Sequence, residues 1–240
     1  MNAVEIRGLS KMFGEQTAVD TFDLTIKQGE FFGLLGSNGA GKTTTIKMLC
    51  CLLQPTSGDA LMMGNSIVKN PEAVKQIINI SPQETAVAPK LTVRENLEMI
   101  ARIYGNSKEQ ASQKADKMLS VFDMKARAKD RAKALSGGLQ RKLSIAMALI
   151  TEPQILFLDE PSLGLDVRAR RELWKTINEL KGIATIILTT HYLEEAEILS
   201  DRICIMDKGK VQIVGTAEGI IGTSGTKTFE DAFLMYTEVG

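Results

Sequence analysis

Residues that bind soft metals are scarce in this chain of 240 residues. There is one histidine, and the three cysteines, Cys50, Cys51 and Cys204, include no CxxC pair. With a single histidine and no such pair, the chain cannot build the ligand set of a structural zinc site. We therefore expect the cysteines to be buried, reduced thiols.

An excess of charge of either sign is also missing, and so is any long apolar run. The 29 lysines and arginines balance 29 aspartates and glutamates, which argues against a nucleic-acid partner. Residues 1–7 lack the apolar core of a signal peptide, and no apolar run approaches the ~18–20 residues that span a bilayer. If the protein works at a membrane, we expect a partner to supply the membrane-spanning part.

Strand-like and helix-like patterns alternate along much of the chain. Continuous apolar runs of the kind found in buried strands occur at residues 31–35 and 155–158, and glycines follow the first of them. This alternation predicts an α/β fold with a mixed, mostly parallel sheet covered on both faces. Further strands are expected at residues 4–7, 24–26, 77–80 and 184–188, a hairpin at 203–214, and helices at 43–53, 167–180 and 192–199.

The pattern between residues 84 and 149 is helical instead. Thr92 and Glu95 form a capping box that opens a helix through residue 103, and helices at 108–122 and up to 150 follow. We expect this block to be an α-helical subdomain inserted into a core that covers residues 1–220. Residues 221–240 are expected to form a short tail, with a flexible link at 222–226 and a helix at 229–236.

A glycine-rich segment with the pattern GxxxxGK[ST] lies between a buried strand and a helix. Such a loop wraps its backbone N–H groups around phosphates, and the positive end of the helix dipole adds to the attraction. Lys42 is expected to neutralise the β- and γ-phosphates, and the hydroxyl of Thr43 to bind Mg²⁺. The nucleotide-binding residues expected here are Gly36, Ser37, Asn38, Gly39, Ala40, Gly41, Lys42, Thr43 and Thr44.

Two acids end the apolar strand at residues 155–158. At the carboxyl end of a parallel strand such side chains face the ligand crevice. Asp159 is placed to hold Mg²⁺, through water, and Glu160 to act as general base on the attacking water. Taken alone, the pair is equally compatible with an ordinary charged strand end. The phosphate loop is what favours the catalytic interpretation.

A second possible anion site precedes a long helix. Ser136, Gly137 and Gly138, in the segment Leu-Ser-Gly-Gly, offer a hydroxyl and backbone N–H groups at a helix start. By itself this is better explained as a helix cap with glycines. Its place in the chain changes the interpretation, because it lies between the phosphate loop and the strand that ends in two acids.

The order of these motifs resembles that of the ATP-binding-cassette (ABC) ATPases, and the resemblance covers nearly the whole chain, from about residue 4 to residue 214. The resemblance implies a P-loop NTPase core and two ATP molecules sandwiched between two such domains. Each ATP would meet the phosphate loop of one domain and the Leu-Ser-Gly-Gly turn of the other. The resemblance further implies that Phe13 and Val19 contact adenine and that Gln83 contacts Mg²⁺ and the catalytic water. It also implies that Asp166 lies at the dimer interface and that His191 contacts the γ-phosphate.

The chain departs from the family pattern at two positions. Leu139 replaces the glutamine that most often ends the signature, and Val167 stands where many members have proline. Leucine cannot hydrogen-bond the nucleotide, but Ser136 and Gly138 remain, so we still expect catalysis. An apolar residue at this place is also similar to what related exporter ATPases tolerate.

These observations predict the motor subunit of an ABC exporter. It would bind ATP and Mg²⁺, pair with a second ABC ATPase subunit, and sit peripherally on the cytoplasmic face of the membrane against separate permease subunits. Residues 229–234 are similar to the tails of bacterial drug- and ion-exporter ATPases. The alternative is a soluble ABC ATPase of a cofactor-assembly, repair or ribosome-associated complex. A P-loop kinase or GTPase would explain neither the Leu-Ser-Gly-Gly turn nor His191.

Overall fold

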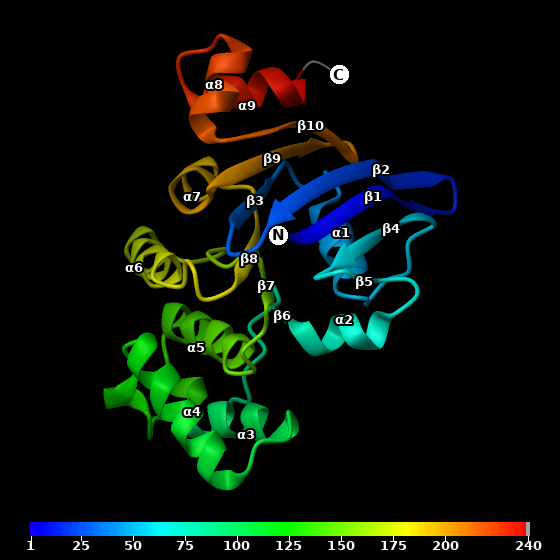
Figure 1. Ribbon diagram of the computed structural model, residues 1–240. Helices are drawn as coiled ribbons and strands as arrows, with labels where there is room; N and C mark the ends of the chain where they lie inside the picture. The colour runs from blue at the N-terminus through cyan, green and yellow to red at the C-terminus, as the bar shows by residue number, and fades with distance from the viewer. Residues whose placement is uncertain (239–240) are drawn as a thin grey trace.

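The computed structural model describes residues 1–238, so the last two residues of the expected tail lie outside the described residues. Its strands form two sheets (Figure 1). The six-stranded sheet has the order β10-β9-β3-β8-β7-β6, and every pair in it is parallel except β9 with β10. Its strands are β3 (Phe31–Leu35), β6 (Ile78–Ser81), β7 (Ile155–Asp159), β8 (Thr185–Thr190), β9 (Arg202–Asp207) and β10 (Lys210–Gly215). The predicted mixed, mostly parallel sheet is confirmed.

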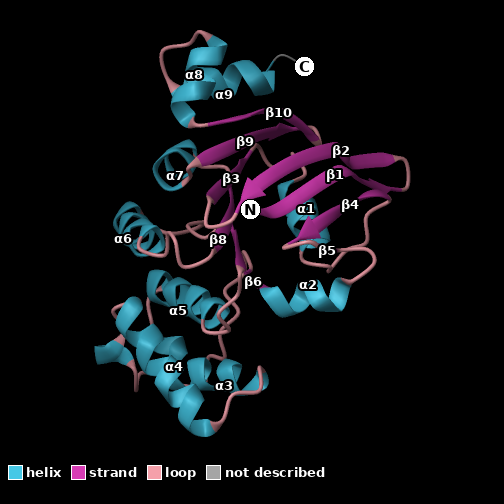
Figure 2. Ribbon diagram, in the orientation of Figure 1, coloured by secondary structure: helices cyan, strands magenta, loops and turns pink. Residues whose placement is uncertain are grey.

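The second sheet is antiparallel and has the order β2-β1-β4-β5. It consists of β1 (Asn2–Phe13), β2 (Gln16–Lys27), β4 (Ser57–Met62) and β5 (Asn65–Ser66). The sequence patterns predict only short parts of β1 and β2 and no separate sheet. Figure 2 shows this sheet lying beside α1 (Lys42–Leu49) and above α2 (Pro71–Ile77).

Side chains of the central strands alternate between two cores, as the period of a β-strand requires. Phe32, Phe157 and Ile187 pack with α1 and the antiparallel sheet, whereas Phe31 and Leu156 pack with helices on the opposite face. Those helices are α3 (Val93–Ile103), α4 (Lys108–Val121), α5 (Gly137–Leu149), α6 (Val167–Asn178) and α7 (Leu193–Leu199). The six-stranded sheet is therefore covered on both faces, on one of them partly by a second sheet.

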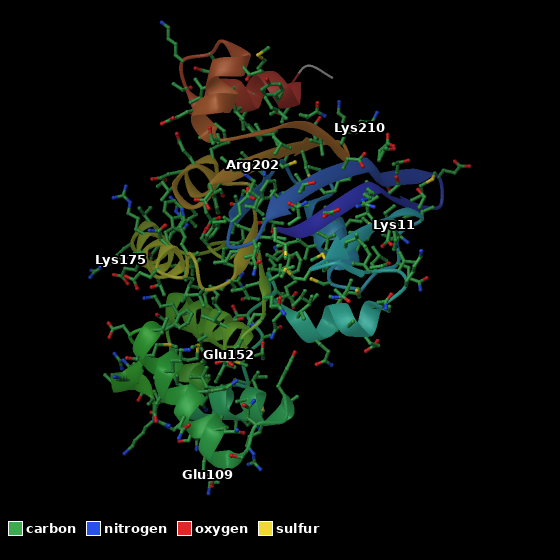
Figure 3. The ribbon with its side chains drawn as sticks, in the orientation of Figure 1. Lys11, Glu109, Glu152, Lys175, Arg202 and Lys210 are labelled. Carbon is green, nitrogen blue, oxygen red and sulfur yellow. The ribbon has the colours of Figure 1, made fainter. Side chains whose placement is uncertain are left out.

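Helices α3, α4 and α5 form the block expected between residues 84 and 149 (Figure 1). The capping box at Thr92 and Glu95 is present, and a second one, at Ser107 and Gln110, opens α4. Figure 3 shows Glu109 at the outer end of this block and Lys175 on the outer side of α6. Charged side chains thus face outward at both places.

The end of the chain differs from the expected flexible link. Helix α8 (Ala217–Ser224) crosses the predicted boundary at residue 220 and ends on Gly225, whose φ of 70° suits a left-handed cap. Helix α9 (Phe229–Glu238) follows, and Ile220 and Phe229 pack against Leu35 on the main sheet. Within residues 1–238, no helix combines the length and apolar character needed to span a bilayer.

Candidate functional site

The phosphate loop connects β3 to α1, as the sequence predicts. β3 is buried along its whole length, which fixes the loop's starting point at the carboxyl edge of the sheet. Gly41 has φ 101°, and a side chain there would strain the backbone and clash with the carbonyl oxygen of Ala18. A Cβ at Gly36 would clash with the carbonyl oxygen of Met206. Glycine is therefore required at both ends of the tight part of the loop.

A cavity of about 430 Å³ lies over this loop. It brings together residues that are far apart in the sequence: the loop itself, Gln83 after β6, Glu160 after β7 and His191 after β8. Each of these positions follows a strand of the same parallel sheet, where a ligand crevice is expected. The full lining is Gln16, Thr17, Ala18, Asn38, Gly39, Ala40, Gly41, Lys42, Thr43, Thr44, Gln83, Glu160, Leu163 and His191.

In this cavity Glu160 lies close to two other charged or titratable side chains, Lys42 and His191. Lys42 Nζ donates hydrogen bonds to the carbonyl oxygens of Gly36 at 2.7 Å and Ser37 at 3.1 Å, and it lies 3.6 Å from Glu160 Oε1. The other oxygen of Glu160, Oε2, lies 2.8 Å from His191 Nδ1. Burial lowers the pKa of the Lys42 ammonium, and the charges of Glu160 and Asp159 act in the opposite direction.

Asp159 lies beneath the cavity and is not among the residues that line it in the described part of the chain. Its side chain is buried, and Oδ1 accepts a hydrogen bond from the hydroxyl of Thr189. The same Thr189 accepts from the backbone N–H of Glu160 through both its Oγ1 and its carbonyl oxygen, each at 3.1 Å. Thr189 thus fixes both acids, a role that no sequence motif indicates.

The predicted adenine contacts lie at the edge of the cavity. Phe13 ends β1 opposite Gln16, the residue is 51% exposed, and Lys11 Nζ lies 5.2 Å from the ring centroid. Val19 is fully buried, and its Cγ2 would touch a side chain at Gly41. Neither lines the cavity, whereas Gln16, Thr17 and Ala18 between them do, and the sequence motifs do not indicate those three.

The Leu-Ser-Gly-Gly turn lies outside this cavity in the described chain. Ser136 caps α5, is exposed, and accepts a hydrogen bond from the N–H of Leu139 at 3.4 Å. Asp166 caps α6 by accepting from Ala169 N at 2.8 Å. A Cβ at Gly138 would lie 3.2 Å from Ala169 Cβ, so the two helix starts are adjacent.

Leu139 does not project into this cavity. It is partly buried and packs against the hydrophobic cluster beneath α5. The departure from the family pattern therefore adds a packing contact within the chain. Beside it, Ser136 and Gly137 are exposed at the surface, and Gly138 is partly buried.

The donor set fits a hard divalent cation held mainly by a nucleotide. Thr43 and Gln83 offer a hydroxyl and an amide oxygen to one cavity, and Mg²⁺ prefers oxygen ligands together with phosphates and water. Residues 1–238 contain no cluster of three or more His, Cys, Asp or Glu side chains suited to a metal. The phosphates would therefore have to supply the remaining ligands.

Comparisons with known proteins agree with this geometry. The family model described as ABC transporter matches residues 19–163. The chain is 40% identical over 224 residues to the daunorubicin resistance ATP-binding protein DrrA3 of Streptomyces coeruleorubidus, covering 93% of this chain and 71% of that protein. It is 38% identical to the Nod factor export ATP-binding protein I of Cupriavidus metallidurans, covering 86% of this chain and 69% of the relative.

Solved structures give the same result. An ATP-binding subunit of an ABC transporter superimposes with a TM-score of 0.85 at 30% identity, over 98% of this chain and 99% of the other. A dimeric post-hydrolysis state of the ATP-binding cassette MJ0796, bound to ADP and Pi, has a TM-score of 0.77 at 27% identity, over 89% and 98%. This chain belongs to the ABC transporter family and is an ATP-binding and ATP-hydrolysing subunit with the P-loop NTPase fold of that family.

Proposed function

We propose that this chain is the motor subunit of an exporter, in which ATP draws two ATPase domains together and hydrolysis lets them part. The observation that carries the proposal is a divided site. The phosphate loop, Glu160 and His191 share one cavity, whereas Ser136 is exposed elsewhere on the same chain. A second copy, or a similar chain, would complete the site with Ser136, Gly137, Gly138 and Asp166.

Within one half-site we assign roles by position. Lys42 would exchange its bonds with the carbonyls of Gly36 and Ser37 for bonds with the β- and γ-phosphates. Glu160 would accept the proton of the attacking water at a carboxylate oxygen, and His191 would hold the γ-phosphate. Stacking on adenine is assigned to Phe13, beside Val19. The phosphates would be bound by residues 36–44.

Mg²⁺ would be held by Thr43 and Gln83, and by Asp159 through water, and it would neutralise charge on the phosphates. The buried position of Asp159 beneath the cavity supports an indirect contact. Gln83 also lies two residues after the end of β6 and just before the helical block, so its position depends on both. We assign residues 84–149 to a helical subdomain and residues 1–220 to the ATPase domain.

The names of the relatives favour a role in export. The name of the Nod factor protein refers to export, and that of DrrA3 refers to daunorubicin resistance. The linearmycin resistance ATP-binding protein LnrL of Bacillus subtilis, 38% identical over 226 residues, is also named for resistance. We propose that the chain binds the cytoplasmic face of a membrane through separate permease subunits. The relatives' names favour the exporter over a soluble cofactor-assembly, repair or ribosome-associated ATPase.

Co-purification tests this proposal. The chain, tagged and expressed at its native level, is recovered from membranes solubilised in mild detergent. We expect an integral membrane protein in fixed stoichiometry, and ATPase activity that changes when that protein is reconstituted with it. Recovery only in a soluble complex, with no membrane protein bound, would refute the exporter assignment and leave the ATPase assignment intact.

A further inference from the structure

One arginine of the helical block reaches into the catalytic end of the main sheet. Arg141 lies on α5, five residues after Ser136, and is only 3% exposed. Burial lowers its pKa to about 10, and the charges of Asp159 and Glu195 oppose the shift. In the described part of the chain, none of its hydrogen bonds goes to a carboxylate; all go to backbone carbonyl oxygens.

These carbonyls lie on both sides of Glu160. Arg141 Nη2 donates to the carbonyl oxygen of Asp159 at 2.8 Å, and Nε donates to that of Pro161 at 2.8 Å. The third nitrogen, Nη1, donates to the carbonyl oxygens of Pro82 and, at 3.1 Å, of Gln83. One planar guanidinium therefore holds the backbone around Glu160 and the backbone that carries Gln83.

The backbone at Glu160 needs such support. Its φ of 47° lies in the left-handed region, which is strained for a non-glycine residue. Thr189 accepts from the N–H of Glu160, and Arg141 binds the carbonyl oxygen of Asp159 in the same peptide unit and that of Pro161 after it. With the backbone held at Asp159 and at Pro161, the Glu160 side chain is directed to His191 and Lys42.

Stability alone does not account for a buried cation here. The neighbours of Arg141 on α5, such as Leu143 and Ile145, are fully buried apolar residues. Burying a cation without a carboxylate partner is costly, and an apolar residue of similar volume is often as stable or more so. What an apolar residue cannot supply is a set of donors for carbonyls from two separate segments, residues 82–83 and 159–161.

We propose that Arg141 is a positioning residue for ATP hydrolysis, which sets the Glu160 carboxylate and Gln83 at the γ-phosphate. The proposal rests on the assignment of Glu160 as general base. Because Arg141 and the Ser136 turn belong to one helix, a shift of α5 moves the turn and the backbone of Glu160 together. A displacement of the base by about 1 Å is enough to reduce turnover about 100-fold.

The test compares Arg141→Lys and Arg141→Gln with the parent chain, and each is combined with Glu160→Gln. Turnover, KM for ATP, equilibrium ATP binding and thermal unfolding are measured, with rates expressed per molecule that binds ATP. Arg127→Lys is the matched control, because Arg127 is exposed and pairs only with Asp130 among the described contacts.

We expect kcat to fall about 100-fold in both variants, while ATP binding changes less than about threefold because the phosphate loop is untouched. Lysine should restore the unfolding temperature but not kcat, since a single ammonium cannot bind both flanking carbonyls. In the Glu160→Gln background, replacing Arg141 should reduce single-turnover hydrolysis only a few-fold.

Two results would overturn the inference: native kcat in Arg141→Lys, or a loss as large in the Glu160→Gln background as in the parent. The second would show that Arg141 acts independently of Glu160. Should Arg141→Gln fail to fold, Arg141→Lys still decides the question. Native turnover by Glu160→Gln alone is a different outcome, because it refutes the assignment of the base itself.

Discussion

Replacing Glu160 by glutamine removes one negative charge and leaves the shape of the side chain nearly unchanged. In the structure, Oε2 of Glu160 lies 2.8 Å from His191 Nδ1 and Oε1 lies 3.6 Å from Lys42 Nζ. An amide can keep the contact with His191 through its oxygen or its nitrogen. It cannot accept a proton from water, so the variant isolates the proposed role of the base.

The expected loss follows from the size of general-base catalysis. Such a base contributes roughly 10²–10⁴-fold, which is about 3–5.5 kcal/mol of barrier. Binding of ATP should be retained or strengthened, because a buried carboxylate that would repel the γ-phosphate is gone. The Glu160 charge raises the pKa of Lys42, and the phosphates of bound ATP replace that charge in the variant.

Phosphate release under saturating ATP measures turnover, and size-exclusion chromatography with ATP measures the dimer. We expect Glu160→Gln to accumulate as an ATP-bound dimer with turnover close to zero. Glu172→Gln is the control: it makes the same chemical change on an exposed side chain of α6 that pairs with Arg168. A dimer of Glu160→Gln that hydrolyses ATP at the native rate would refute the assignment.

Three further predictions concern other parts of the chain. Ser136→Arg should leave ATP binding to the isolated chain intact but block the ATP-dependent dimer in size-exclusion chromatography; lost monomer binding would contradict the divided site. Thr92→Ala removes an N-cap bonded to Glu95 N and should lower the free energy of unfolding by about 1 kcal/mol in denaturant titration. Burial raises the pKa of Glu195, which accepts from Trp174 Nε1 at 2.7 Å, above the usual 4.5. Because the folded state binds the Glu195 proton more tightly than the unfolded state does, the free energy of unfolding falls as pH rises above 4.5. Glu195→Gln should therefore become increasingly more stable than the parent over that range.

Much of the main sheet follows from local pattern. The runs at 31–35 and 155–158 are apolar throughout because both faces of those strands are buried, and the structure places β3 and β7 there. The sequence does not predict the antiparallel sheet, because pairing between β1 and β4 joins residues more than 45 positions apart, such as Ser10 and Ser57. No periodicity within either segment indicates that partner.

The helix boundaries show the same limit. The sequence predicts a helix through residue 53, but α1 ends at Leu49, where the chain turns through Cys50 and a left-handed Cys51 with φ 56°. Helix α8 was missed because its glycines and threonine favour a loop by propensity. Packing of Ile220 against the main sheet outweighs that local preference.

Within the site, the predictable residues are those whose role depends on local backbone form. The glycines of the phosphate loop and the acids at the end of β7 belong to this group. Arg141 and Thr189 do not. Arg141 binds carbonyls 18 to 59 positions away, and Thr189 binds Asp159 30 positions away, so only the folded chain shows what they do.

Because the starts of α5 and α6 are adjacent, the two nucleotide sites of a dimer would affect each other. Gly138 at the start of α5 lies against Ala169 at the start of α6, and Asp166 caps that same helix. A nucleotide bound to the partner that contacts Ser136 would therefore shift the starts of α5 and α6 together. Arg141 would transmit this shift to the backbone on either side of Glu160. Glu160 acts on the other ATP, the one bound to its own chain. In the proposed arrangement, closure of the dimer around one nucleotide therefore positions the Glu160 carboxylate that acts on the second nucleotide. Hydrolysis at the two sites should then be coupled, even though each cavity is built by a single chain.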